Sequence, residues 1–187
     1  MGQYYRPVLR YAESRRSTIY NRKVDGQYTM AKLMEHSWWH NEFVSTLCKK
    51  LYKNPMRVVW VGDYSDDADE TNGLTKEDLK ELRKIAWYRK GREVEKDELL
   101  LDGKFLVNHT KGCYIDCSEY RNACERDGWC IHPLPLLTAV GNGLGGGDYM
   151  RGTNVEDVGR WANDIISVED VEPGEDYSKE QFEFIEE

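Results

Sequence analysis

The chain of 187 residues suits one domain with a single core, because 40% of its residues are hydrophobic and 12% are aromatic. Its formal net charge of −8 comes from the C-terminus, where residues 164–187 hold ten acidic side chains against Lys179 alone, so the rest of the chain is near neutral. A near-neutral body with an acidic end releases few counterions from a polyanion, which argues against nucleic acid as a partner. The sequence shows neither a bilayer-spanning apolar stretch nor a signal peptide, so we expect a cytoplasmic protein without a membrane partner.

The first elements in chain order are predicted to be two strands and a helix. Residues 3–11 and 17–23 are rich in Tyr, Val, Ile and Thr and flank a turn, which predicts an antiparallel pair. Apolar residues then recur at about 3.6-residue spacing over residues 28–53, which predicts one long helix unless it breaks near residues 36–41. The helix is expected to end at Asn54-Pro55.

A central strand and a shorter helix follow. Residues 56–64, MRVVWVGDY, form a continuous apolar run closed by Gly-Asp, as expected for a buried strand whose carboxyl end carries polar groups. Residues 66–70 are mostly acidic and predict an exposed loop. Thr75 and Asp78 form a capping-box pattern, which predicts a helix from there to about residue 88.

The second half of the chain predicts further strands and an acidic tail. Residues 104–108 and 113–116 are typical of a hairpin, residues 136–140 of a short strand and residues 158–168 of a last strand. The predicted fold is therefore a single α+β domain over residues 1–168, with a mostly antiparallel sheet, one long helix and one shorter helix. Residues 169–187 are expected to form an acidic, mobile tail.

Six of the sixteen glycines lie in residues 141–152, GNGLGGGDYMRG. Glycine loses more conformational entropy on folding than any other residue, so this cluster indicates positive φ angles or a backbone that something approaches closely. Bare backbone N–H groups form concave anion sites, which favours a ligand-binding loop. The segment matches no phosphate-loop motif in full, and a loop packed over aromatic rings or a flexible lid is the structural alternative. The predicted ligand-binding residues here are Asn142, Gly143, Gly145, Gly146, Gly147, Asp148, Tyr149 and Arg151.

A second candidate segment is KLMEHSWWHNEF, residues 32–43, which places two tryptophans between two histidines. A tryptophan ring can stack on a nucleobase while neighbouring polar groups bind the base edge. A core role for the rings is the structural alternative. A metal site at His36 and His40 is a weaker alternative, since the glutamate and third ligand of a zinc helix are missing. The predicted ligand contacts are His36, Trp38, Trp39 and Asn41.

Further candidates lie outside these two segments. Asp63 ends the predicted central strand, a common position for a functional carboxylate, although capping of the turn is an alternative role. Arg6, in the basic N-terminal strand, is expected to close a phosphate site. In an enzyme, the acid or base would be His36, His132 or Asp148, since histidine readily transfers protons near neutral pH.

The cysteines do not follow a familiar metal pattern. Cys113, Cys117, Cys124 and Cys130 have the spacing C-x3-C-x6-C-x5-C, which lacks the paired C-x2-C or C-x4-C knuckles of zinc sites. Ordinary thiols are therefore expected, and neither a metal nor another cofactor is predicted. A zinc site at these four cysteines is the alternative.

Six segments spread along the chain form a specific combination: MGQYYRP, KLMEHSWW, VVWVGDY, LVNHTK, HPLPLLTAVGNGLGGGDY and VGRWANDIIS. Together they resemble a family of small, largely uncharacterised proteins from bacteria, their bacteriophages and mobile elements, and the similarity covers most of the chain up to Ser167. The resemblance implies a bacterial host cell and a setting in which small proteins often block host immunity. By analogy, one such strategy is a sponge that sequesters nucleotide signals such as cyclic ADP-ribose derivatives or cyclic dinucleotides.

Three functions are consistent with these patterns. The first is binding of a small phosphorylated nucleotide, as an anti-defence sponge, because glycine backbone, aromatic planes and a few polar groups are what a preformed nucleotide pocket requires. The second is an enzyme that hydrolyses such a nucleotide. The third is an inhibitor that binds a host defence protein through the acidic tail. The sequence leaves the oligomeric state open, a homo-oligomer included.

Overall fold

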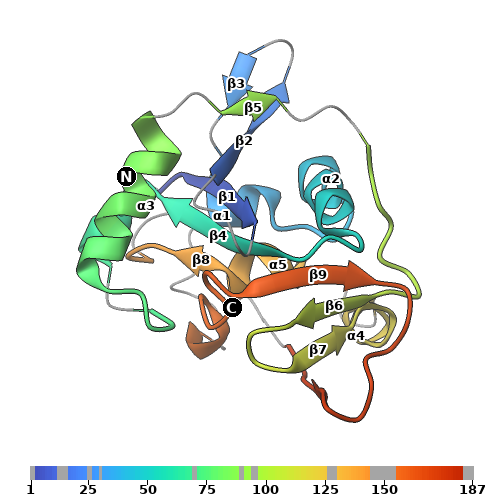
Figure 1. The fold of residues 1–187 in the computed structure, drawn as a ribbon. Helices are drawn as coiled ribbons and strands as arrows, with labels where there is room; N and C mark the ends of the chain where they lie inside the picture. The colour runs from blue at the N-terminus through green and yellow to red at the C-terminus, as the bar shows by residue number, and fades with distance from the viewer. Residues whose placement is uncertain are drawn as a thin grey trace.

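The computed structural model describes residues 3–11, 17–24, 27–29, 31–68, 71–88, 91–93, 97–125, 130–143 and 155–182. Its helices and mostly antiparallel sheet form an α+β domain, as the sequence predicts (Figure 1). None of the helices in the described ranges has the length and apolar character of a membrane span.

Strands that are far apart in the sequence pair in one sheet. They are β1 (Tyr5–Tyr11), β2 (Ser17–Val24), β3 (Gln27–Thr29), β4 (Met56–Gly62), β5 (Arg92–Glu93), β6 (Phe105–Asn108), β7 (Cys113–Asp116), β8 (Ala139–Val140), β9 (Ile165–Glu169) and β10 (Ser178–Lys179). Their order is β10-β7-β6-β9-β4-β1-β2-β3, with β5 beside β2 and β8 beside β4. β4 is central, as its apolar sequence predicts, and pairs with β1 along one edge and with β9 and β8 along the other.

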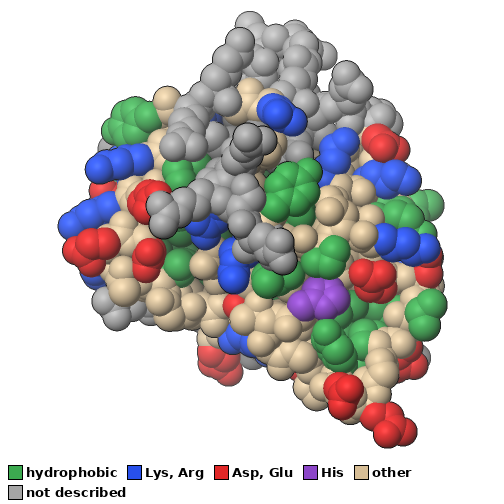
Figure 2. Space-filling model, in the orientation of Figure 1, with side chains coloured by type: hydrophobic (Ala, Val, Ile, Leu, Met, Phe, Trp, Pro, Cys, Tyr) green, Lys and Arg blue, Asp and Glu red, His purple; other side chains and the backbone are tan. Residues whose placement is uncertain are grey.

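The helices cover both faces of this sheet. They are α1 (Leu33–His36), α2 (Glu42–Leu51), α3 (Lys76–Tyr88), α4 (Cys117–Glu125) and α5 (Pro133–Leu137), with short 3-10 turns η1 (Ser65–Asp67) and η2 (Val155–Asp157). In β4, Val58 and Trp60 belong to the larger core with α1, α2 and α5, whereas Val59 and Val61 belong to a smaller core under α3 (Figure 1). Basic and acidic side chains intermingle on the outer surface of α3, as is typical of a solvated helix face (Figure 2).

Several predicted elements are confirmed. β1 and β2 form the expected antiparallel pair, with Val8 opposite Ile19, and β6 and β7 form the expected hairpin. The capping box is also present, because the backbone N–H of Thr75 donates a hydrogen bond to Oδ2 of Asp78 at 2.9 Å where α3 begins. These elements share strong local signals, either continuous apolar runs or capping residues.

The structure differs from the prediction of one helix over residues 28–53. Residues 27–29 are strand β3, and the remainder is divided into α1 and α2 at the expected break. Asn41 caps the start of α2, since its Oδ1 accepts hydrogen bonds from the N–H groups of Phe43 and Val44 at 3.1 and 3.2 Å. The apolar spacing continues across the break because both helices bury side chains in the larger core.

Two predicted strands are shorter than expected. Before β8 the chain forms α5, because Nδ1 of His132 caps the helix by accepting the N–H of Leu134 at 3.1 Å and Pro133 occupies its first turn. Only Ala139 and Val140 of this region are extended. Before β9, residues 158–163 form turns, and Asn163 has a φ of +66°.

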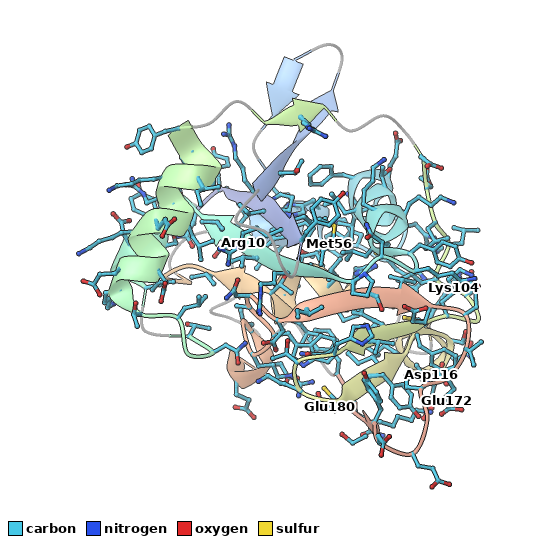
Figure 3. All side chains as sticks on the ribbon, in the orientation of Figure 1. Arg10, Met56, Lys104, Asp116, Glu172 and Glu180 are labelled. Atoms are coloured by element: carbon cyan, nitrogen blue, oxygen red, sulfur yellow. The ribbon has the colours of Figure 1, made fainter. Side chains whose placement is uncertain are left out.

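Residues 169–182, predicted as part of a mobile tail, pack against the domain instead. β10 pairs with β7 in parallel, and Phe182 is buried in the larger core. Glu180 forms an ion pair with Arg160 at 2.8 Å, and the Tyr114 hydroxyl donates a hydrogen bond to Glu172. Figure 3 labels Glu172 and Glu180 beside the β6–β7 hairpin. The acidic segment therefore belongs to the folded unit through residue 182.

Candidate functional site

The carboxyl ends of β4 and β8 leave the sheet side by side. The two strands are parallel, with Trp60 opposite Ala139 and Val61 opposite Val140. The following residues, Gly62-Asp63 and Gly141-Asn142, therefore meet at one edge. Beyond the carboxyl ends of parallel strands, main-chain groups and loop side chains converge, and ligands commonly bind there. We call the polar residues at this edge, Gln3, Arg6, Asp63, Arg83 and Asn142, the edge cluster.

Gln3 connects the start of β1 to the chain that follows β8. Its side chain is buried; Oε1 accepts a hydrogen bond from the Tyr5 hydroxyl at 2.5 Å, and Nε2 donates one to Oδ1 of Asn142 at 3.3 Å. A Cβ atom added to Gly62 or Gly141 would overlap the Gln3 amide. A protein side chain thus explains why glycine is needed at both positions, so Gly141 is accounted for by packing and not by a ligand.

Asp63 both caps the turn after β4 and presents a carboxylate. Its Oδ1 accepts the N–H of Tyr4 at 3.1 Å, and its own N–H donates to the Tyr4 carbonyl at 3.0 Å. Nε of Arg83 donates to the Asp63 carbonyl at 2.6 Å and forms an ion pair with Asp66 at 3.2 Å. Burial raises the pKa of Asp63, while the hydrogen bonds and the charge of Arg83 oppose this shift. None of these bonds uses Oδ2, which leaves one carboxylate oxygen for a ligand.

Arg6 lies close to Asp63 in the strand register. Arg6 is opposite Val61, so Asp63 is its diagonal neighbour, a relation in which side chains are typically about 7–8 Å apart. The guanidinium lies 4.5 Å from the centre of the Trp87 ring, and Nη1 donates to the Ala86 carbonyl at 3.0 Å. Burial lowers the pKa of Arg6. A guanidinium carries five N–H donors, so this arrangement holds Arg6 in place with donors to spare.

Two predicted base contacts lie in the core. His36 is 1% exposed, and its Nε2 accepts a hydrogen bond from Nε1 of Trp60 at 2.7 Å. Trp39 is 6% exposed, with its ring centre 5.4 Å from that of His132 and 5.7 Å from that of Tyr120. His36 ends α1 and Trp39 lies in the turn before α2, and both side chains point inward, which leaves little of either accessible to a ligand. The prediction is corrected to the structural alternative for these two residues.

Trp38 and Asn41 belong to the same part of the fold. Trp38 is half-buried, forms an isolated β-bridge with Ile131 and packs against the larger core. Asn41 uses its side-chain oxygen to cap α2. Both residues therefore lie beside α1 and α2. In the edge cluster, by contrast, Arg6 contacts α3 and Arg83 belongs to it.

His132, a predicted acid or base, lies in a buried pair with Cys48. Nε2 of His132 is 3.4 Å from Sγ of Cys48. Burial lowers the pKa of His132 to about 3 and raises the pKa of Cys48. The pair is therefore a thiol and a neutral imidazole, not the thiolate and imidazolium of a nucleophilic site. With both His132 and His36 buried, neither is placed to exchange protons with a ligand.

None of the five cysteines forms a disulfide. Cys113 and Cys117 are buried, and Cys124 and Cys130 are half-buried. Across the parts of the chain that the structure covers, no group of three or more His, Cys, Asp or Glu side chains is arranged to hold a metal ion. The alternative of a zinc site at the four cysteines therefore gains no support.

The glycine-rich segment is described only at its start. Gly143 is buried and has a φ of +69°, a left-handed conformation that glycine adopts without strain. Asn142 is half-buried beside Gln3. The chain thus enters the rest of the segment from the edge cluster. The residues that lie outside the described ranges, with roles that stay predictions, are Gly145, Gly146, Gly147, Asp148, Tyr149 and Arg151.

Sequence reasoning does not find three residues at this edge: Gln3, Arg83 and Trp87. Arg83 and Trp87 are four residues apart on α3, a spacing that places them on the same side of the helix, but the sequence does not reveal which strand end they approach. Gln3 has no local signal, because its role depends on the pairing of β8 with β4.

No known protein family, curated protein or solved structure matches this chain. The resemblance to proteins of bacteriophages and mobile elements therefore stays a prediction. The functional assignment rests on the geometry of the edge cluster.

Proposed function

We propose that the protein binds a small phosphorylated nucleotide at the edge cluster and sequesters it. The observation that supports this proposal is the parallel pairing of β8 with β4, which brings Asp63 and Asn142 together where the glycine-rich segment begins. A few polar groups that converge on an otherwise apolar scaffold are typical of small-ligand sites. The proposed setting is the cytoplasm of a bacterial host, where the protein acts as an anti-defence sponge.

Each polar group of the edge cluster has a role in this proposal. Oδ2 of Asp63 and the side-chain amide of Asn142 bind ribose hydroxyls. Arg6 binds a phosphate, because its guanidinium is held against Trp87 and can offer two parallel N–H donors to phosphate oxygens. Arg83 fixes the turn that carries Asp63.

Binding without hydrolysis is the better supported alternative. Two of the three candidate acids or bases, His36 and His132, are buried in the larger core. Burial keeps His132 neutral through most of the acidic range, since it lowers the pKa to about 3. The third candidate, Asp148, lies outside the described residues.

Calorimetry on the full chain tests the proposal with a panel of linear and cyclic nucleotides. At least one nucleotide should bind wild type, and Asp63→Asn should weaken it about 10-fold or more, as expected when a hydrogen bond to a charged group is lost. Asp97→Asn is the matched control, because Asp97 is exposed and outside the edge cluster; it should bind like wild type.

Two results would contradict the proposal. One is the absence of heat from every nucleotide with folded wild-type protein; the other is unchanged affinity in Asp63→Asn. Chromatography of the denatured sample distinguishes binding from hydrolysis, since a binding protein leaves the nucleotide intact and an enzyme converts it to a product.

A further inference from the structure

Two arginines face each other across the central strand pair, at the opposite end of β4 from the edge cluster. Arg10 of β1 is directly opposite Arg57 of β4, two register steps beyond the pair Val8–Val59. Directly opposed residues of an antiparallel pair point to the same face, so both arginines lie on the α3 side of the sheet. Figure 3 labels Arg10 and, one residue before Arg57, Met56. Like charges in such positions destabilise a strand pair, so this arrangement needs a compensating partner.

Both guanidinium groups converge on Asn163. Nη1 of Arg57 donates to the Asn163 carbonyl oxygen at 2.9 Å, and Nη2 of Arg10 donates to Oδ1 of the same residue. Asn163 is itself fixed, because its φ is +66° and its N–H donates to the Val58 carbonyl at 2.8 Å. One rigid turn residue therefore holds the two cations side by side.

Carboxylates do not neutralise this arginine pair within the described ranges. Neither guanidinium has a carboxylate at ion-pair distance there, and both side chains are half-buried. Burial and the charge of Arg57 lower the pKa of Arg10, and the attraction of Glu81 and Asp78 on α3 only partly offsets this. Oδ2 of Asp78 also accepts a hydrogen bond from the Thr75 hydroxyl at the start of α3.

The carboxylate closest in sequence to Asn163 forms hydrogen bonds with other residues. Asp164 follows Asn163, but its two oxygens accept hydrogen bonds from Nδ2 of Asn72 at 3.0 Å and Nδ2 of Asn108 at 2.8 Å. Asn163 supplies the arginines with oxygen acceptors but with no negative charge. Among the described residues, no carboxylate forms an ion pair with either guanidinium, and Glu81 and Asp78 offset the positive charge only in part.

We propose that Arg10 and Arg57 form a binding site for a phosphate-type oxyanion. Each guanidinium has five N–H donors in a planar fork, and Asn163 accepts from one nitrogen of each, so donors from both remain for the oxygens of a single phosphate. The bound anion would cancel the repulsion between the arginines. Arg57 is six residues along β4 from Asp63, about 20 Å in an extended strand, so this site is separate from the edge cluster and independent of the proposed nucleotide site.

Binding of inorganic phosphate and of glycerol 3-phosphate, a phosphate ester without a nucleoside, to the full chain tests this site. The midpoint of thermal unfolding is measured against sodium acetate at equal ionic strength, and the arginine Nε–H signals of wild type are followed by NMR. Arg10→Gln and Arg57→Gln should each weaken the response to phosphate about 10-fold or more. Arg92→Gln is the matched control, since Arg92 is exposed on β5, and it should keep the wild-type response.

The two ligands separate free phosphate from a phosphate ester as the natural occupant, since the one with the tighter binding identifies the source. A saturable response to either ligand that both variants lose supports the site. An equal response in wild type and both variants, or to acetate as well as phosphate, overturns it. If the variants do not fold, the wild-type spectrum decides: Arg10 and Arg57 signals that fail to shift with phosphate overturn the proposal.

Discussion

The two faces of the sheet differ in how deeply they bury polar side chains. On the face covered by α2 and α5, His36 and His132 are buried and each is held by a neighbour from another element, Trp60 or Cys48. On the α3 face, Arg6 and Arg10 are only half-buried and retain their charge at the margin of a small core. The comparison shows that residue type alone does not identify a site. Burial and the number of occupied hydrogen-bonding groups separate structural polar residues from those that remain open to a ligand.

Truncation of the two tryptophans between α1 and α2 should show the largest effect of burial on stability. Trp39→Ala should lower the free energy of unfolding by about 3–5 kcal/mol, because it removes a buried aromatic ring from the larger core. Trp38→Ala should cost clearly less, since Trp38 is half-buried. Urea unfolding measures both. A larger loss for Trp38→Ala would show that the placement of the two rings is wrong.

A second prediction concerns acid sensitivity from His132. Its pKa in the folded protein is about 3, below the ordinary 6.5, so between these values the unfolded chain binds a proton that the folded chain does not. The contribution of neutral His132 to the free energy of unfolding is therefore fully present above about pH 6.5. It falls by about 1.4 kcal/mol per pH unit as the pH decreases toward 3.

His132→Asn is the variant that isolates this effect, because asparagine can still cap α5 but does not titrate. Urea unfolding between pH 7 and 4 should show a shallower loss of stability in His132→Asn than in wild type. Parallel pH profiles for the two proteins would contradict a buried, neutral His132.

The smallest expected effect concerns the glycine at position 141. Gly141→Ala should lower the free energy of unfolding by about 1–3 kcal/mol, because its Cβ would displace the buried Gln3 amide from its hydrogen bonds. Gly174→Ala is the control: nothing lies within 4 Å of the added atom, so a change within about 0.5 kcal/mol is expected. Equal effects in thermal or urea unfolding would mean that Gln3 does not require glycine at position 141.

The sequence predicts those elements whose signal is local. The apolar run of β4 and the Thr75–Asp78 cap of α3 can be recognised in the sequence, and both are present in the structure. Pro133 was also a local signal, since proline favours the first turn of a helix, and it would have predicted α5 in place of a longer strand. The boundary at Asn41 was only partly visible, because the helical spacing of apolar residues continues through it.

The candidate site depends on contacts that no local pattern contains. Asp63 and Asn142 are brought together by the pairing of β8 with β4, and Gln3 is added by the pairing of β1 with β4. His36 and Trp39 are residue types common in ligand sites, but their burial is a property of the packed fold. Residue types indicated useful candidates, whereas their grouping required the structure.

NMR mapping of the bound nucleotide tests the proposed function at the level of single residues. Backbone NMR signals of the labelled full chain are followed while the tightest-binding nucleotide of the panel is added. We expect saturable shifts at Gln3, Asp63, Arg83 and Asn142, with small shifts at Trp38 and Trp39. Shifts centred on the two tryptophans, with the edge cluster unchanged, would contradict it.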